Sequence, residues 1–440
     1  MTMRFALSIL VLVISHNGLA KAIIDSPDSN LQKLFHETRT KYVIRYHHTF
    51  IDTLTIPEGC ELAFDGGSLS GPIKFVETKL SGRVNLHGST LSGSIRNKVF
   101  NADWICAADG ITDDAECIND MIKVCGYVLF PKGKYRLKSA FSPNGIVDKK
   151  LHSSIQTHIG IHRSHVKLIG DEGAEFVTDE PLCTICVFSL PNQIDNSIRD
   201  VEICGLTFTV HNNGKDFHEF MHTIKLMGVN GMTIKNCKFN DFWGDAICLS
   251  HYGDDSQTGE RSRNQEVKIL NNHIEGGVMH NNRNGISIIN GKNVLIKNNT
   301  IRNTSRKDMP GGIDVEPNNS AYTIDSIRIL KNSIEDVWTN AIIVYIHKNA
   351  PAHNINIEDN VIRNCGHGVY VGIMSDNTTD NIEIINNYVD EKTVPYIFSG
   401  EGISANWVVK NNTFDRPCVQ DIPGTIKVKN LVVKGNKKKE

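Results

Sequence analysis

The stretch VKILNNHI (267–274) returns five more times along the chain, and this repeat decides the fold. Each copy is an alternating strand, then an asparagine, then one more apolar residue. The other copies are VLIKNNTI (294–301), IRILKNSI (327–334), INIEDNVI (355–362), IEIINNYV (382–389) and WVVKNNTF (407–414). Their aligned asparagines are Asn272, Asn299, Asn332, Asn360, Asn387 and Asn412, at intervals of 27, 33, 28, 27 and 25 residues.

The length of the repeat selects the class of fold. Periods of about 20 to 50 residues indicate a solenoid. Short strands with no helical periodicity between them indicate β-coils rather than helical or leucine-rich repeats. We therefore predict an all-β protein, a right-handed parallel β-helix. Asparagine tolerates the left-handed backbone conformation and hydrogen-bonds its neighbours, so the repeated asparagines are predicted to be turn residues in a ladder and not ligands.

Composition narrows the classes of function. The 440 residues are 40% hydrophobic and 22% charged, which is the ordinary globular range. With 47 basic and 49 acidic residues the formal net charge is −2, so no overall field would gather nucleic acid. Eleven cysteines are too sparse for a disulfide-stapled fold. The lone CxxC of Cys183 and Cys186 lacks a second ligand pair at zinc-site spacing, so no metal is predicted there.

The N-terminus MTMRFALSILVLVISHNGLAKA (1–22) is typical of a secretory signal peptide. It has an apolar run from Phe5 to Ile14 and an A-x-A arrangement at Ala20 and Ala22. The run is too short to span a bilayer, and no later segment has the roughly 18 consecutive apolar residues that a transmembrane helix needs. We predict cleavage after Ala20 or Ala22, a secreted or periplasmic protein, and no membrane insertion.

Two further regions precede the long repeat. In residues 23–107, SLSG, KLSG and TLSG place Leu69, Leu80 and Leu91 at a period of eleven, which predicts a short β-rich region. A β-helix domain is then predicted over 108–440. It opens with DGITDDAECINDMIKVCGYVLFPKGKYRL, in which Asp113 and Asp114 can begin a short capping helix before a strand and a turn.

This opening resembles that of a known superfamily. DGITDD, then a helix, then VLFPKGKYRL is similar to the opening segment of pectate-lyase and polygalacturonase β-helix proteins, and the asparagine phrases resemble their parallel β-helix repeat. The preceding FDGGSLSG is similar to what secreted gut-bacterial members carry. The resemblance covers roughly residues 60–436. It implies the fold more than the reaction, because this fold hosts hydrolases, lyases, epimerases and phage tailspikes.

A second series of short strands follows the asparagine phrases. Aligned by a small residue and the apolar residue after it, the series is DAICLS (245–250), NGISII (284–289), GIDVEP (312–317), NAIIVYI (340–346), HGVYVGI (367–373) and EGISAN (401–406). Alternation predicts an inward stack of Ile247, Ile286, Ile313, Ile342, Val369 and Ile403. The alternate positions face outward and become neighbours on one wall, because stacked coils lie ~4.8 Å apart.

Acidic and aromatic residues gather on that wall. The candidate catalytic residues are Asp314, Glu316, Asp245 and Arg283. Same-face residues two apart lie ~6.6 to 7 Å apart at Cα, so Asp314 and Glu316 are expected to flank one sugar ring or its attacking water without sharing a proton. That spacing suits the two carboxyls of an inverting glycosidase, and Asp245 is a third candidate at ~10 Å. The candidate substrate-binding residues are His251, Lys307, Tyr345, His367 and Tyr370.

The pattern leaves several functions open. The favoured one is a glycoside hydrolase that acts on a polysaccharide or oligosaccharide. GDAICLS followed by RNGISII resembles the polygalacturonase pattern, but Ala246 replaces its second aspartate and no histidine precedes Gly285. A lyase or uronate epimerase that uses Arg283 and Lys307 is the second hypothesis. A non-catalytic glycan-binding β-helix is the third, in which the acids merely bind sugar or keep the strands soluble.

No cofactor is predicted from the sequence, with one reservation about a cation. Asp254 and Asp255, in the acidic loop HYGDDSQTGERSRNQE (251–266), could bind calcium. The oligomeric state is not specified by any pattern in the chain.

Overall fold

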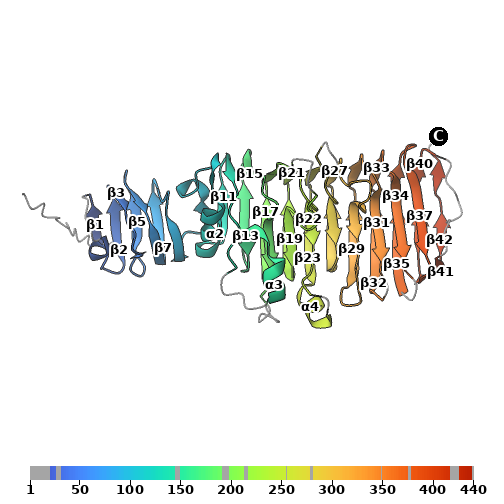
Figure 1. The fold of residues 1–440 in the computed structure, drawn as a ribbon, viewed down its shortest axis with the longest axis horizontal. Helices are drawn as coiled ribbons and strands as arrows, with labels where there is room; N and C mark the ends of the chain where they lie inside the picture. Colours follow the sequence, from blue (N-terminus) through green and yellow to red (C-terminus); the bar gives the residue numbers. More distant parts are fainter. Residues whose placement is uncertain are drawn as a thin grey trace, which may run out of the picture.

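The computed structural model describes residues 20–25, 31–143, 149–190, 198–212, 217–253, 255–277, 281–347, 349–374, 378–416 and 426–438. The chain winds into an elongated stack of coils, with a smaller N-terminal stack before the long one (Figure 1). All strand pairing in the long stack is parallel, and each strand pairs with its counterpart in the next coil. The predicted parallel β-helix is confirmed.

Three long sheets form the walls of the stack in the described residues, and we number them for use below. Sheet 1 has nine strands: β13 (Thr157–Ile161), β16 (Cys183–Phe188), β19 (Ile224–Met227), β22 (Ile247–Leu249), β25 (Ile286–Ile288), β28 (Gly311–Val315), β31 (Asn340–Ile346), β34 (His367–Ile373) and β37 (Val394–Gly400).

Sheet 2 has fourteen strands: β9 (Phe100–Asn101), β11 (Tyr127–Phe130), β14 (Lys167–Gly170), β17 (Ile198–Cys204), β20 (Val229–Lys235), β23 (Asn264–Leu270), β26 (Gly291–Lys297), β29 (Ile324–Leu330), β32 (Ala352–Glu358), β35 (Thr378–Ile385), β38 (Ile403–Ala405), β39 (Val408–Lys410), β41 (Lys427–Lys429) and β42 (Val432–Lys434).

Sheet 3 has twelve strands: β10 (Asp109–Asp113), β12 (Gly133–Arg136), β15 (Ala174–Thr178), β18 (Thr207–Val210), β21 (Lys238–Asn240), β24 (His273–Glu275), β27 (Thr300–Arg302), β30 (Ser333–Glu335), β33 (Val361–Arg363), β36 (Tyr388–Val389), β40 (Thr413–Phe414) and β43 (Lys437–Lys438).

The N-terminal stack has its own parallel sheets. One contains β1 (Ala20–Ile24), β2 (Thr40–Ile44), β4 (Leu54–Thr55), β5 (Glu61–Phe64), β7 (Pro72–Gly82) and β8 (Thr90–Ile95), and the other pairs β3 (His47–Thr49) with β6 (Ser68–Ser70). The leucines of the eleven-residue repeat, Leu69, Leu80 and Leu91, are all buried in it. Residues 1–19 of the predicted signal peptide lie outside the described residues.

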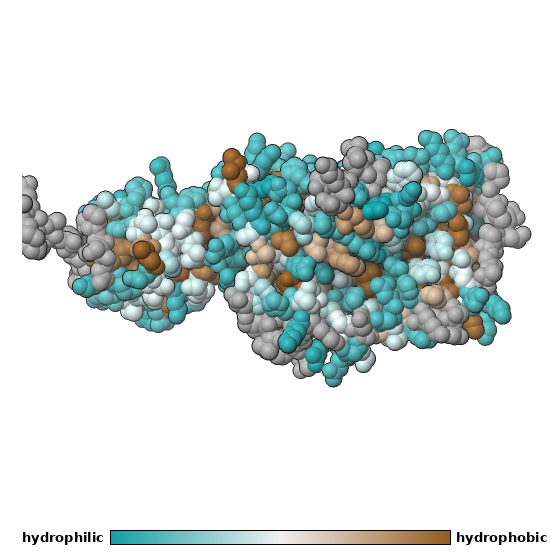
Figure 2. Space-filling view, in the orientation of Figure 1, coloured by the Kyte–Doolittle hydropathy of each residue, from teal (hydrophilic) through white to brown (hydrophobic). Residues whose placement is uncertain are grey.

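Few helices interrupt the coils in the described part of the chain. They are α1 (Leu31–Leu34), α2 (Ala115–Val124), α3 (Lys149–Ser154), α4 (Ser256–Arg261) and the 3-10 turn η1 (Ala102–Trp104). None of them is long and apolar enough to cross a membrane. Hydrophilic residues cover most of the face in Figure 2, with small apolar patches between them. The apolar side chains fill the interior of the coils in one continuous core.

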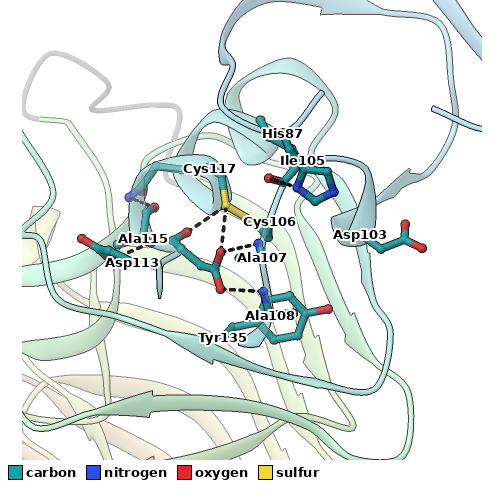
Figure 3. Close-up of a disulfide and its surroundings, with 12 residues drawn as sticks. His87, Asp103, Ile105, Cys106, Ala107, Ala108, Asp113, Ala115, Cys117 and Tyr135 are labelled. Atoms are coloured by element: carbon teal, nitrogen blue, oxygen red, sulfur yellow. Dashed lines mark hydrogen bonds between the residues drawn. A yellow bond between two sulfur atoms is a disulfide. The ribbon is translucent and has the colours of Figure 1, made fainter. Parts of the chain in front are cut away.

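The segment before α2 is tied to the helix by a disulfide between Cys106 and Cys117 (Figure 3). We expected Asp113 and Asp114 to cap this helix. Asp113 does accept a hydrogen bond from the Ala115 amide, at 3.1 Å. The Asp114 carboxylate instead accepts from two backbone amides of residues 107 and 108, at 2.8 and 3.1 Å. Both acids therefore hold the start of α2, although only one binds the helix itself.

The repeated asparagines form a ladder inside the stack. Each is at most 2% exposed. From Asn299 to Asn412 and on to Asn436, each Oδ1 accepts from the backbone and side-chain N–H groups of the asparagine one coil earlier, whereas Asn272 Oδ1 accepts from the Cys237 amide. The prediction of a ladder is therefore confirmed.

Their expected backbone conformation is wrong. The left-handed residue is the one before each ladder position, such as Asn271 (φ 54°) and Lys331 (φ 55°). The ladder asparagine has a different task, which is to satisfy buried backbone groups at the corner between sheets 2 and 3. Its amide carries both a donor and an acceptor, so one residue type can repeat the same bonds in every coil.

Sheet 1 has the predicted register except at its end. Pairing joins Ile247, Ile286, Ile313, Ile342 and Val369 in one inward row, and all five are fully buried. The assignment of EGISAN as the sixth strand of this sheet is wrong. The strand after β34 is β37, VPYIFSG, whereas Ile403 and Ser404 belong to β38 in sheet 2, and Ile403 is 52% exposed. The chain completes another sheet 1 strand before it reaches residue 401.

Candidate functional site

Arg283 is the centre of a charged cluster on the outer surface of sheet 1. It precedes β25, and its guanidinium, 11% exposed, lies between four carboxylates. Nη1 is 3.1 Å from Asp245 Oδ2, and Nη2 is 3.4 Å from Asp314 Oδ2 and 3.3 Å from Glu316 Oε2. Nε is 3.6 Å from Glu219 Oε1. The four predicted catalytic residues are therefore brought together, and a fifth charged group joins them.

Asp245 binds the guanidinium on its buried side. Its side chain is fully buried and accepts hydrogen bonds from Arg283 Nη1 and from the Asn284 backbone amide at 3.0 Å. Burial acts to raise the pKa of Asp245, but the charge of Arg283 outweighs it and lowers that pKa to about 2. The Asp245 backbone amide donates to Nδ1 of buried His222 at 3.1 Å. Asp245 thus orients Arg283 and has no exposed surface with which to meet a substrate.

Asp314 is also buried, although the sequence predicted an open outer face. Its neighbours on β28, Ile313 and Val315, point into the core, so Asp314 points away from it, under Arg283. Its Oδ2 accepts from Asn284 Nδ2 at 3.1 Å and from Arg283, whereas Oδ1 has no hydrogen-bond partner in the structure. Asp314 thus lies on the outer face of its strand, as expected, but side chains from the neighbouring coil cover it.

Asp314 on β28 and Glu316 directly after it contact the same nitrogen of Arg283, Nη2. Burial, and then repulsion by Glu316, raise the pKa of Asp314 well above its ordinary value, although Arg283 opposes this. The shared guanidinium draws both carboxyls to one point, so the Cα spacing overstates their separation.

Glu316 is the outer member of the pair. It follows β28 directly, is 18% exposed, and accepts from Arg283 Nη2 with one oxygen. Its other oxygen lies 3.0 Å from His347 Nε2, a residue that follows β31. The ring of His347 is 5.0 Å from that of Tyr345, which is 6.5 Å from that of Tyr370. The predicted tyrosines therefore continue from Glu316 along the coils.

The other predicted substrate-binding residues lie beside this row or apart from it. His367 on β34 is hydrogen-bonded to Asn340 at 2.9 Å, and burial lowers its pKa. The His251 ring packs on Tyr322 with centroids 4.2 Å apart, and its Nδ1 is 2.6 Å from the tyrosine hydroxyl. Lys307 is exposed in the turn between β27 and β28. These contacts make His251 and His367 part of the supporting structure.

Calcium was the one cation that the sequence allowed. Asp254 lies outside the described residues. Asp255 caps α4, and its side chain accepts from the Thr258 amide at 3.0 Å. That hydrogen bond occupies one of the two carboxylates that would have to bind calcium.

Two groups of potential metal ligands occur among the described residues. The first contains Cys106 and Cys117, which are joined in a disulfide and are therefore not thiolate ligands. The second is His222, Asp245 and Cys248, all buried, with ligand atoms within 4.8 Å of one another. In that group the Asp245 carboxylate already binds the Arg283 guanidinium, and a second cation beside it would be repelled.

Three site residues escaped the sequence analysis: Glu219, His222 and His347. The first two precede β19, whose sequence IKLM (224–227) is an earlier member of the sheet 1 series that the alignment began too late to include. His347 lies two residues beyond Tyr345, so the same alternation that selected Tyr345 would have placed it on the outer face.

Comparison with known proteins identifies the fold. Residues 222–419 match a family described as the right handed beta helix region, so this part of the chain is a right-handed parallel β-helix. The matched range contains every member of the charged cluster except Glu219. No curated protein sequence matches the chain.

Several solved structures share the architecture at low identity. An exopolygalacturonase of Yersinia enterocolitica is 12% identical, with 79% of this chain and 78% of that chain covered and a TM-score of 0.46. The A-module of an Azotobacter vinelandii mannuronan C-5 epimerase is 12% identical, with 77% and 97% covered and a TM-score of 0.42. A surface adhesin of Streptococcus pneumoniae is 15% identical, with 78% and 100% covered and a TM-score of 0.40.

Proposed function

We propose that this protein is a secreted or periplasmic glycoside hydrolase that cleaves a polysaccharide, with Asp314 and Glu316 as its acid. The observation that carries the proposal is that a fully buried carboxyl, Asp314, and a partly exposed one, Glu316, both contact Nη2 of Arg283. Hydrolysis of a glycosidic bond needs a carboxylic acid that keeps its proton at working pH and gives it to the leaving oxygen.

The arrangement assigns a role to each member of the pair. Glu316 is exposed enough to meet a glycosidic oxygen and gives it a proton. Asp314, which is fully buried and contacts the same guanidinium nitrogen, holds the proton that replaces it. Arg283 contacts both carboxyls and balances the negative charge that remains on them. The pair therefore acts as one acid, and the water must be activated by another group.

The charge of the cluster favours hydrolysis over elimination or epimerisation. Those reactions need a cation to neutralise the carboxylate of a uronic acid. Here the guanidinium of Arg283 is mostly buried and is already shared between carboxylates, and Lys307 lies in an exposed turn. A net-negative site instead stabilises the positive charge that develops on a sugar ring as its glycosidic bond breaks.

A glycan-binding protein without activity is the remaining alternative. The exposed part of the wall, Glu316, His347, Tyr345 and Tyr370, would serve a binding surface equally well. What binding does not require is a buried carboxyl that keeps its proton beside a second carboxyl. Perturbed carboxyls of this kind concentrate at catalytic sites, because proton transfer needs them.

The test is a panel of polysaccharides incubated with the purified protein. The panel should contain a neutral α-1,3-glucan, polygalacturonate, mannuronan and a sulfated galactan, and products should be measured both as reducing ends and as unsaturated ends. We expect reducing ends without ultraviolet-absorbing unsaturated sugars from at least one substrate. Unsaturated products would show a lyase, and binding with no new chain ends would show a glycan-binding protein.

A further inference from the structure

We infer that Glu219 is the second catalytic carboxylate, the base that activates the attacking water. This inference rests on the proposed glycoside hydrolase function and adds a residue to it. No sequence pattern pointed to Glu219, which lies in the turn before β19, 64 residues before Arg283 in the chain.

Exposure separates the four carboxylates that surround the guanidinium. The side chains of Asp245 and Asp314 are completely buried, so neither can contact a water molecule held against a sugar ring. The side chain of Glu316 is 18% exposed and that of Glu219 is 40% exposed. Among the described residues of this cluster, only these two acids can meet a substrate from solvent.

The two exposed carboxylates lie at different positions on one guanidinium. Glu219 Oε1 is 3.6 Å from Nε, and Glu316 Oε2 is 3.3 Å from Nη2. Because both nitrogens belong to one small planar group, the two carboxylates are at most about 9 Å apart, which does not exceed the upper limit of the ~6.5 to 9.5 Å that inverting glycosidases use to hold a water. Asp314 and Glu316 instead contact the same nitrogen, Nη2, and Asp314 is fully buried, so this pair offers no open position for that water.

Two buried polar atoms of the cluster have no hydrogen-bond partner. Arg283 Nε is buried and has no hydrogen-bond partner in the structure, because Glu219 at 3.6 Å is beyond hydrogen-bond distance. Asp314 Oδ1, which is fully buried, is unpaired as well. Buried polar groups normally find partners, so two such atoms beside the exposed carboxylates indicate a place for a polar ligand.

The turn that carries Glu219 is held against the cluster. The Gly244 amide donates to the Met221 carbonyl at 2.9 Å, and its own carbonyl accepts from the Arg283 amide at 2.9 Å. A Cβ on Gly244 would come within 2.5 Å of the Glu219 carbonyl oxygen, so only glycine allows this approach. The ring of His218 also packs on Trp243, with centroids 5.0 Å apart. Glu219 is therefore fixed relative to the segment that bears Asp245.

The reaction balances with these groups. Glu219 takes one proton from the water, whose oxygen forms a bond to the anomeric carbon. The glycosidic carbon–oxygen bond breaks with its electron pair, and the leaving oxygen takes a proton from Glu316. Asp314 then returns a proton to Glu316, and the pair is recharged from solvent. Attack from the face opposite to the leaving group inverts the configuration at the anomeric carbon.

The experiment compares Glu219→Gln with Glu316→Gln and a matched control, on whichever substrate of the panel the wild-type protein hydrolyses. The control is Glu335→Gln, because Glu335 on sheet 3 is 36% exposed and lies 3.4 Å from Nε of Arg302, much as Glu219 lies beside Arg283. We expect Glu219→Gln to lower kcat by about 10²- to 10⁴-fold, with substrate affinity within about threefold of wild type. Glu335→Gln should leave both unchanged.

A second readout is the stereochemistry of the product, followed by NMR as the sugar is released. We expect the first product to have the inverted anomeric configuration. Retained configuration, or a Glu219→Gln variant with kcat within threefold of wild type while Glu316→Gln is inactive, would overturn the role of Glu219 and leave the hydrolase proposal standing. Absence of hydrolysis by the wild-type protein on every substrate would overturn both.

Discussion

Two buried polar networks run through this molecule, and they differ in how completely they are satisfied. In the asparagine ladder each Oδ1 accepts two hydrogen bonds and each Nδ2 donates to a backbone carbonyl and to the next asparagine. In the Arg283 cluster, Asp314 Oδ1 and Arg283 Nε have no hydrogen-bond partner. The ladder is neutral and repeats, whereas the cluster is charged and is confined to four adjacent coils.

The contrast distinguishes polar groups that stabilise the fold from polar groups that carry out chemistry. A neutral network that satisfies every group stabilises and specifies a fold. A charged network with unpaired atoms costs stability, and it persists where the groups do chemistry. Substitutions in the ladder should therefore lower stability alone, whereas substitutions in the cluster should also lower activity.

The largest effect is expected from Glu316→Gln and Asp314→Asn. Each amide keeps the size of the side chain but removes the transferable proton, which contributes about 10²- to 10⁴-fold in rate. We expect kcat to fall by that factor in both variants while the melting temperature changes little. Reducing-end release and thermal unfolding measure the two properties. Undiminished hydrolysis in both variants would show that other carboxylates act.

The second effect concerns stability within the cluster itself. Arg283→Met keeps the aliphatic stem but leaves Asp245 as a buried carboxylate without its cation, which typically costs about 3–5 kcal/mol. The matched control is Arg302→Met, which removes a surface arginine, 41% exposed, whose ion pairs contribute about 0–1 kcal/mol. Urea unfolding of both variants would show the difference. Equal losses would mean that the cluster behaves like an exposed ion pair.

The third effect is confined to the ladder. Asn332→Ala removes the acceptor for two N–H groups of buried Asn299, so we expect a loss of about 1–3 kcal/mol for each group left unpaired and no change in kcat. Asn436, at the open end, is only partly buried, so water can replace its bonds in Asn436→Ala. A large drop in kcat for Asn332→Ala would show that the ladder also positions the site.

The repeat made most of this fold predictable. Strand alternation and the asparagine spacing are local properties of the sequence, so sheets, register and ladder followed from them. The same alternation placed Asp314, Glu316 and Tyr345 on one face. It failed at EGISAN, because an extra strand without the small first residue, VPYIFSG, precedes it.

What the sequence could not reveal depends on contacts between coils. Alternation says that Asp314 points outward but not that Arg283 and Asn284 cover it, and burial is what raises its pKa. Glu219 lies in a turn, where no periodicity applies, and only the close approach at Gly244 brings it to the cluster. The fold was therefore readable from repeated residues, whereas the site depends on residues that occur once.

The fourth effect is a dependence of stability on pH with opposite signs at the two buried aspartates. The folded-state pKa of Asp314 is raised, so above about pH 4 the unfolded chain releases this proton while the folded chain keeps it, and stability falls as pH rises. Asp314→Asn cannot titrate, so its stability relative to wild type should increase from pH 4 to pH 7.

Asp245 should show the reverse. Its folded-state pKa is lowered to about 2, so its contribution to stability, about 2 kcal/mol, is present above about pH 4 and is lost as pH falls toward 2. Asp245→Asn should therefore be less stable than wild type at pH 7, and the deficit should shrink in acid. Urea unfolding between pH 3 and pH 7 tests both signs, and parallel profiles for the two variants would contradict the assigned charges.

The smallest effect is expected at the aromatic end of the wall. Tyr370 lies two coils beyond Asp314 in the same outward row, partly exposed, with its ring 6.5 Å from that of Tyr345. If a sugar ring packs on it, Tyr370→Ala should lose about 0.5–1.5 kcal/mol of binding, a two- to twelvefold rise in KM with kcat nearly unchanged. Tyr388→Ala on sheet 3 is the control, because that ring packs beside Arg363 away from sheet 1. An equal rise in KM for both variants would show that the loss reflects general destabilisation, and a fall in kcat for Tyr370→Ala alone would place this ring beside the reacting sugar.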